Sequence, residues 1–260
     1  MTPDFLSTLN AVKKVLAADF ACEESDFDNT GVFIYQTKEL PGRRDFPFRK
    51  NAFAAATMGR GIIISCSLER LGWADANLSG LTRNEVFAQP TIALMDSYVK
   101  QSGQCIAGPD LKHICTKSIF RPYKPEGDTK INLIEDVASL GLYGDKRFPN
   151  SLGHGANPQT PWMVAAVAKY GGQIAGIATA SADCDVMWQI GVDTLPEYRK
   201  RGIGKAMVSA VTEYLLEHGV IPYYSTFESN TASRATAAAL GYKPAWVELN
   251  ARELKAEGGQ

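Results

Sequence analysis

A strand-like run, a short basic loop with two glycines, and a helix-like run follow one another between residues 185 and 218. The loop reads Arg199, Lys200, Arg201, Gly202, Ile203, Gly204, Lys205. Backbone N–H groups at a helix N-terminus have no partner within the helix, so they suit an anion. Glycine lets the backbone approach a ligand closely, and cations add charge-assisted hydrogen bonds to phosphate. The junction therefore predicts a diphosphate site.

Two common phosphate loops do not fit these residues. A Walker A loop needs Ser or Thr after Gly-Lys, where the chain has Ala206, and a first glycine where the chain has Arg199. A dinucleotide fingerprint needs a small third position, which Met207 occupies, and a later acidic residue, which the run 219–227 lacks. The pattern that remains is R-x-x-G-x-G, which ends at Gly204.

Strand and helix patterns alternate around this loop. Two glycines between strand-like runs favour a tight hairpin, because a type I′ turn needs a positive φ at both central residues. Apolar residues spaced three and four apart then predict a helix with one buried stripe, which Gly219 ends. Asn230 is a good N-cap for an alanine-rich helix. The expected elements are strands 163–170, 173–181, 185–192, 220–227 and 242–249, and helices 204–218 and 231–240.

This order, the R-x-x-G-x-G loop and the segment from Asn230 to Leu240-Gly241-Tyr242 resemble the GNAT superfamily of N-acetyltransferases. The resemblance covers roughly residues 116–249. It implies an acyl-CoA transferase fold, in which helices flank a central mixed sheet with two splayed parallel strands. It also implies acetyl-CoA as cosubstrate and no metal. The coenzyme A contacts that it implies are Ile190, Val192, Arg199, Lys200, Arg201, Gly202, Ile203, Gly204, Lys205, Asn230 and Ser233.

The resemblance implies that acetyl-CoA donates its acetyl group to a primary amine of a small molecule, protein or peptide, by direct attack in a ternary complex. Positioning would supply most of the catalysis, with the Val192 N–H supporting the thioester oxygen. Many family members carry a Tyr acid seven residues after the capping Asn, and this chain has Ala237 there. Asp185 and Glu228 are the acids expected near the splayed strands, as candidate proton acceptors.

Two other function classes stay open. Without the tyrosine, the chain could be a non-catalytic acyl-CoA-binding regulatory module. The same basic loop could also serve a nucleotide-binding protein. The acceptor amine is not identified by these residues.

Composition narrows the partners and the location. A net charge of −1 over 260 residues argues against a nucleic-acid partner. No apolar run approaches the roughly 20 residues of a membrane span, and the first residues lack a signal-peptide pattern. Five cysteines without a C-x-x-C pair favour a reducing cytoplasm over a disulfide frame or zinc site. These features are also compatible with a homodimer.

The first half of the chain carries no motif that identifies it. Its patterns predict helix 5–20, strands 32–36 and 62–67, and helix 84–101, which Pro90 would break. We expect an α+β domain over residues 1–115 and the acetyltransferase-like domain over 116–260, so the whole chain is of a mixed α+β and α/β class. The first domain could shape the acceptor pocket, dimerise or bind a regulator.

Overall fold

A computed structural model describes residues 2–45, 52–125, 127–142, 144–153, 159–227 and 229–254. These residues form two compact units that alternate along the chain. Unit 1 comprises the described residues within 1–11, 44–46 and 113–244, and unit 2 those within 12–43, 47–112 and 245–260. The division passes through one helix and two strands, so the two units share continuous secondary structure.

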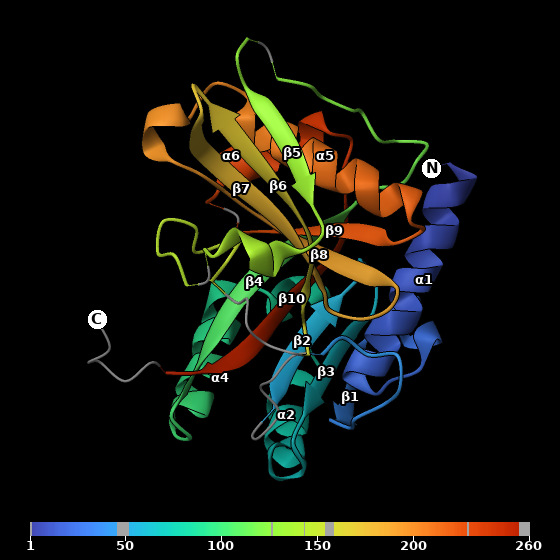
Figure 1. The fold of residues 1–260 in the computed structure, drawn as a ribbon. Coiled ribbons are helices and arrows are strands. Elements are labelled where there is room, and N and C mark those ends of the chain that lie inside the picture. The colour runs from blue at the N-terminus through green and yellow to red at the C-terminus, as the bar shows by residue number, and fades with distance from the viewer. Residues whose placement is uncertain are drawn as a thin grey trace. The chain divides into compact units, whose positions relative to one another are not determined.

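The sheet of unit 1 has the strand order β9-β8-β7-β6-β5 (Figure 1). All neighbours are antiparallel except β8 and β9, which run parallel. Gly171 and Gly172 join β6 to β7 with φ angles of 56° and 83°, as a type I′ turn requires. The strands are β5 (Lys130–Ile134), β6 (Trp162–Tyr170), β7 (Gln173–Ala182), β8 (Met187–Thr194) and β9 (Ile221–Phe227).

Both faces of this sheet are covered by apolar side chains. Along β6, Val164, Ala166 and Ala168 pack into the core formed with helix α5 (Ile203–Glu217), while Ala165 and Val167 face a second cluster. Alternate residues of a strand point to opposite faces, so a strand buried on both sides is apolar throughout. The second cluster is completed by Val137, Phe148, Leu152 and Ile177.

The remaining elements of unit 1 are α6 (Thr231–Ala239), η3 (Val137–Leu140) and η4 (Pro196–Tyr198).

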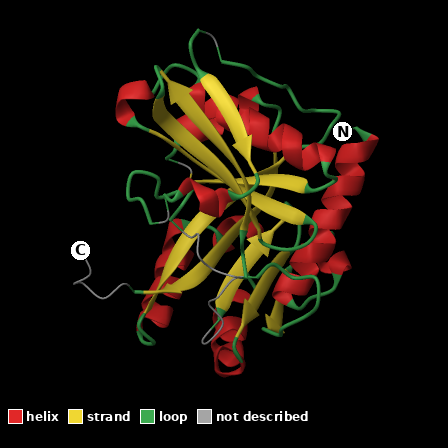
Figure 2. Cartoon of the chain, in the orientation of Figure 1, coloured by secondary structure: helices red, strands yellow, loops and turns green. Residues whose placement is uncertain are grey.

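The strands of unit 2 have the order β1-β3-β2-β10-β4 and are accompanied by helices (Figure 2). The pair β1 and β3 is parallel, and β2 is antiparallel to β3 and β10. The strands are β1 (Val32–Gln36), β2 (Phe53–Thr57), β3 (Ile62–Cys66), β4 (Gln104–Ile114) and β10 (Lys243–Glu253). The helices are α1 (Pro3–Phe20), α2 (Leu71–Leu78), α3 (Arg83–Val86) and α4 (Gln89–Lys100), with η1 (Glu24–Phe27) and η2 (Leu68–Arg70).

The predicted mixed α/β class, with a mixed sheet flanked by helices, is confirmed. The predicted break at Pro90 has a different form, because Pro90 lies in the first turn of α4 and not inside one long helix. The sequence did not predict β2, α2, β4 or β5. Strand β4 continues through Gly108 and Pro109, two residue types that are rare in strand interiors.

The last strand was predicted over 242–249 but extends to Glu253. Its neighbours are β2 and β4 of unit 2, and Leu249 and Ala251 belong to the apolar core of that unit. Gly108 allows the close approach of β4 to β10, because a Cβ atom there would lie 2.9 Å from the Glu248 carbonyl oxygen. The predicted division into domains 1–115 and 116–260 stays a prediction.

Candidate functional site

The parallel pairing of β8 and β9 ends partway along both strands. The paired residues are Met187 with Ile221, Trp188 with Pro222, and Gln189 with Tyr223. Both strands then continue, β8 to Thr194 and β9 to Phe227. We call the region beyond the last pair the wedge.

The backbone of β8 presents alternate residues to this wedge. The Leu195 N–H donates to the Ala175 carbonyl of β7 at 2.9 Å, and the Val186 carbonyl accepts from Ile221 N–H on the β9 side at 2.9 Å. Because the N–H and C=O of successive strand residues point to opposite sides, the even-numbered residues of β8 face β9. Ile190 and Val192 therefore present their backbone groups to the wedge.

The basic loop follows β8 and leads into α5. Lys200 and Gly202 have φ angles of 63° and 75°, so two residues of this short loop are left-handed. Such turns gather backbone N–H groups into a concave anion site. Gly202 is the N-cap of α5 and offers no side chain to the first turn, which contains no acidic residue. The loop and helix start thus combine N–H donors with the positive end of the helix dipole.

The side chains of the loop differ in their surroundings. Arg199, Lys200 and Arg201 are exposed, whereas Ile203 is buried in the core. The Arg199 Nε donates to the Thr194 carbonyl at 3.1 Å, so its guanidinium holds the end of β8. The remaining cation, that of Lys205, lies 3.5 Å from the centre of the Tyr123 ring.

Tyr123 also covers one side of Gly202. A Cβ atom on Gly202 would lie 2.4 Å from the Tyr123 hydroxyl oxygen. The Tyr123 N–H donates to Ser209 Oγ of α5 at 2.8 Å, which fixes the segment before β5 against the helix. No local sequence pattern predicts this contact, since it joins residues far apart in the chain.

Helix α6 follows β9 in the chain and supplies a second set of polar groups. Asn230 caps the helix, since its Oδ1 accepts from the Ser233 N–H at 3.1 Å. Ser233 also forms a side-chain hydrogen bond with Tyr224 of β9, while burial raises the pKa of Tyr224 above its usual value. Ala237, the position where many relatives carry Tyr, is fully buried and packs in the same core as Tyr224.

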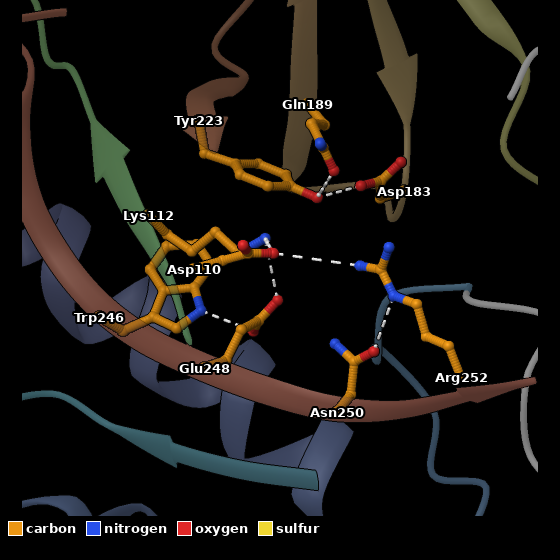
Figure 3. Close-up of polar contacts among 9 residues, drawn as sticks. All are labelled: Asp110, Lys112, Asp183, Gln189, Tyr223, Trp246, Glu248, Asn250 and Arg252. Carbon is orange, nitrogen blue, oxygen red and sulfur yellow. Dashed lines mark hydrogen bonds and ion pairs between the residues drawn. The ribbon is translucent and has the colours of Figure 1, made fainter. Parts of the chain in front are cut away.

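Three polar side chains, two of them buried, meet at the closed end of the wedge (Figure 3). The Tyr223 hydroxyl contacts the carboxylate of Asp183 and lies 2.9 Å from Gln189 Oε1. Gln189 and Tyr223 are the last paired residues of β8 and β9. Asp183 and Tyr223 are among the functional candidates that sequence reasoning missed, because Asp183 lies in the turn before β8.

The two predicted proton acceptors are not brought together here. Asp185 is exposed in the same turn, at the end where β8 and β9 are still paired. Glu228 lies outside the described residues. Their roles stay predictions.

Asp193 holds a loop against the far half of β8. Its carboxylate accepts from Asn150 N–H and Nδ2, and from Ser151 N–H and Oγ, at 2.6–2.9 Å. Gly191 makes this approach possible, because a Cβ atom there would lie 2.2 Å from the Asn150 carbonyl oxygen. The loop at 150–151 therefore covers one face of β8 beyond Gln189.

Unit 2 has a buried polar cluster of its own, also drawn in Figure 3. Lys112 Nζ lies 3.1 Å from Glu248 Oε1 and 3.6 Å from Asp110 Oδ2, and Trp246 Nε1 donates to Glu248 Oε2 at 2.8 Å. Arg252 extends the cluster, 4.0 Å from Asp110 Oδ2. The cluster joins β4 to β10 through charged side chains that are themselves desolvated.

The described residues contain neither a metal-binding group nor a membrane-spanning helix. No group of three or more His, Cys, Asp or Glu residues is placed to hold a metal ion. Within the same residues, no helix has the length and apolar character needed to cross a membrane.

Comparisons with known proteins point to one family. Residues 130–242 match the family model described as acetyltransferase (GNAT) family. No curated protein matches the chain. Among solved structures, a GCN5-related N-acetyltransferase-like protein from Streptococcus suis is 18% identical, with a TM-score of 0.45 over 63% of this chain and 68% of the other. A GCN5-related N-acetyltransferase from Kribbella flavida is 17% identical, with a TM-score of 0.46 over 62% of this chain and 65% of the other.

The matched segment contains strands β5 to β9 of unit 1, the basic loop, and helices α5 and α6. The resemblance predicted from R-x-x-G-x-G and from the Asn-capped helix is confirmed for this part of the chain. Residues 130–242 are a GNAT acetyltransferase domain.

Proposed function

We propose that unit 1 binds acetyl-CoA and transfers its acetyl group to a primary amine of a small molecule, protein or peptide. In this proposal the amine attacks the thioester directly in a ternary complex. The diphosphate binds the N–H groups of the loop 199–205. The acyl-pantetheine arm lies in the wedge and bonds the backbone of Ile190 and Val192.

One observation supports this proposal above the others. The pairing of β8 and β9 stops at Gln189 and Tyr223, and the same strand β8 leads into a loop with two left-handed residues at the start of α5. An extended ligand can therefore bond strand backbone at one end and helix N–H groups at the other. A nucleotide would use only the second of these features.

Catalysis then depends on positioning and on local hydrogen bonds. Holding the amine against the thioester carbonyl converts a bimolecular reaction into an effectively unimolecular one. The Val192 N–H supports the developing oxyanion. Asp185, Glu228 or a water molecule is the candidate acceptor of the amine proton. Tyr224, which bonds Ser233, is the candidate group to meet the departing thiolate.

Donor binding is the first test. A ligand that binds only the folded protein raises the free energy of unfolding by about 2.7 kcal/mol at one hundred times its Kd. We expect acetyl-CoA to raise the Tm, and NAD and ATP to leave it unchanged. If millimolar acetyl-CoA leaves the Tm unchanged, the proposal is wrong, and a shift with ATP instead would favour the nucleotide-binding alternative.

Thiol release separates an enzyme from a regulatory module. The protein is incubated with acetyl-CoA and a panel of amino acids, aminosugars, polyamines and peptides, and free coenzyme A is measured. An acetyltransferase releases thiol with at least one amine in the panel. Donor binding without release under any condition would favour the acyl-CoA-binding module.

A further inference from the structure

The closed end of the wedge carries a buried polar network that the donor site does not need. Asp183 is 3% exposed and Tyr223 is fully buried, and both lie within unit 1. Ser181 Oγ donates to Asp183 Oδ1 at 3.0 Å, and the other carboxylate oxygen contacts the Tyr223 hydroxyl. The side chain of Gln189 reaches the same hydroxyl from β8.

A tyrosine has one hydroxyl proton, so Tyr223 cannot donate to Asp183 and to Gln189 at the same time. Two arrangements satisfy the three groups. In one, Asp183 is ionised and accepts from Tyr223, while the Gln189 amide NH2 donates to the hydroxyl oxygen. In the other, Asp183 is protonated and donates to Tyr223, which donates to Gln189 Oε1. The second arrangement holds one proton more than the first, and the amide of Gln189 fits both by rotation.

The segment 44–45 of the chain lies against this network. The Asp45 N–H donates to the Asp183 carbonyl at 2.6 Å, and the buried guanidinium of Arg44 lies 5.9 Å from the centre of the Tyr223 ring. This segment brings the charged side chains of Arg44 and exposed Asp45 to the network, and exposed Asp185 follows Asp183 in the same turn. A nearby cation favours the ionised form of a buried carboxyl.

The position of the network matches the place where the reaction would occur. Tyr223 and Gln189 form the last strand pair before the wedge opens, next to the backbone groups of Ile190. Because Tyr223 is fully buried in the free protein, its hydroxyl meets a thioester only when a substrate enters at the inner end of the wedge. Asp183 contacts that hydroxyl and would act on the reaction through it.

We propose that Tyr223 receives the proton of the acceptor amine and passes its own proton to Asp183. This inference rests on the proposed function. The amine nitrogen bonds to the thioester carbon, the carbon–sulfur bond breaks, and its electron pair leaves with the coenzyme A thiolate. The nitrogen proton moves to Tyr223 Oη as the hydroxyl proton moves to Asp183 Oδ2. The neutral Asp183 then returns the proton to water by the reverse path. In this reaction Tyr223 is a catalytic residue, and Asp183 is a positioning residue that acts through it.

The test uses the full chain and the most active amine of the thiol-release panel. Asp183→Asn and Tyr223→Phe should each lower kcat about 10²-fold, the usual contribution of a general base, with the KM for acetyl-CoA unchanged. The pH of half-maximal rate should move up toward the pKa of the free amine. Asp128→Asn and Tyr214→Phe are matched controls on exposed or half-buried positions, and both should keep the parent rate and pH profile.

A spectroscopic measurement does not depend on the acceptor or on turnover. Removal of the carboxylate should lower the pKa of Tyr223. When phenolate absorbance is followed against pH, one tyrosine should therefore ionise at lower pH in Asp183→Asn than in the parent. In the Tyr223→Phe background the same change should have no effect. Tyr223→Phe also removes only one oxygen, so it serves if Asp183→Asn does not fold.

The outcomes separate this inference from the function on which it rests. A parent protein that releases no thiol with any amine contradicts the proposed function, and the proton relay with it. An active parent with fully active Asp183→Asn and Tyr223→Phe variants contradicts the relay alone. If Asp185→Asn, and not Asp183→Asn, lowers kcat and raises the pH of half-maximal rate, the carboxylate that acts is that of Asp185. That result would overturn the relay.

Discussion

At the scale of single residues, two left-handed positions determine the loop that leads into α5. A left-handed conformation costs an L-residue about 1–2 kcal/mol, and Lys200 is one of two described non-glycine residues with a positive φ. Strain of this kind is concentrated at ligand sites in folded proteins. At Gly202 the same conformation comes without this cost, but the space beside it is filled by Tyr123.

Gly202→Ala should therefore weaken acetyl-CoA binding and also lower stability. The new Cβ strains a left-handed residue and displaces Tyr123, so we expect a higher KM for acetyl-CoA and a loss of about 1–2 kcal/mol in the free energy of unfolding. Gly171→Ala is the matched control, because Gly171 is also left-handed but has open space around its Cα. It should lose stability with no change in donor KM. An equal KM in both variants would mean that the loop has been misassigned.

Gly204 provides a milder version of this substitution. Its Cβ would lie 3.0 Å from Thr194 Oγ1, a flexible side-chain atom, and its φ is not left-handed. Gly204→Val should raise the donor KM with little loss of Tm, and Arg199→Ala should change the KM less than either glycine variant. The exposed guanidinium of Arg199 contributes modestly because water screens it. The comparison is made from acetyl-CoA saturation curves of the three variants.

We propose that Tyr224 takes the place of the missing Tyr acid at Ala237. Burial raises its pKa, so the phenol stays protonated through the whole range of an ordinary assay. The rate should rise with pH to a plateau set by the amine, with no falling limb up to about pH 10, the reference pKa of tyrosine. Tyr224→Phe should lower kcat about 10²-fold with an unchanged donor KM. A variant with the parent kcat would show that the thiolate leaves without a protein acid.

At the scale of elements, β8 has different partners along its two edges and its two faces. One edge pairs with β7 over its full length, while the other pairs with β9 only as far as Gln189. On one face Ile190 packs with α5, and on the other Asp193 binds the loop at 150–151. The strand can leave β9 because these other contacts hold it in place.

Asp193→Ala should release that loop. Hydrogen bonds to charged groups contribute about 1.5–3 kcal/mol each and are not additive, so we expect a loss of about 2–3 kcal/mol in all. Asp193→Asn should lose less, because its amide oxygen can still accept from one of the N–H groups. Hydrogen exchange provides the local measurement: the amides of Asn150 and Ser151 should lose protection in Asp193→Ala. Unchanged protection would mean that the loop is held mainly by Phe148 and Leu152.

The elements that the sequence predicted well are those with strong local signals. The hairpin around Gly171, the helix after Gly202 and the Asn230 cap each depend on residues close together in the chain. The missed elements depend on distant contacts: β4 contains a glycine and a proline, and becomes a strand through its neighbour β10. The prediction of a donor loop, which stays a prediction, rests on the same kind of local signal. The network of Asp183 and Tyr223 could not, since no periodicity connects a turn to a later strand.

At the scale of the whole molecule, the core of unit 1 contains groups that ionise in alkaline solution. Burial raises the pKa of Cys115 to about 12 and the pKa of Tyr242 well above its usual value. In the unfolded chain these groups lose protons above about pH 9 and 10, whereas the folded protein retains them. Their contribution to stability is therefore complete below pH 9 and is lost as the pH rises toward 12.

The Tm should accordingly fall steadily between pH 9 and pH 11, as measured by circular dichroism. Cys115→Ala removes one of the groups, so the difference in Tm between parent and variant should narrow or reverse as the pH increases. A difference that is constant from pH 7 to pH 11 would contradict the assignment of this pH dependence to Cys115.

The pairing of β10 with β2 has a consequence for how the protein is made. The ribosome delivers residues 53–57 long before residues 247–250, yet these segments are neighbours in one sheet. Until the last strand emerges, β2 has one neighbour, and the core around Phe53 and Ile64 lacks Leu249 and Ala251. During synthesis β2 therefore has an unpaired edge until β10 is made. Nascent chains are prone to aggregate at such edges, so chaperones would need to shield this one until translation ends.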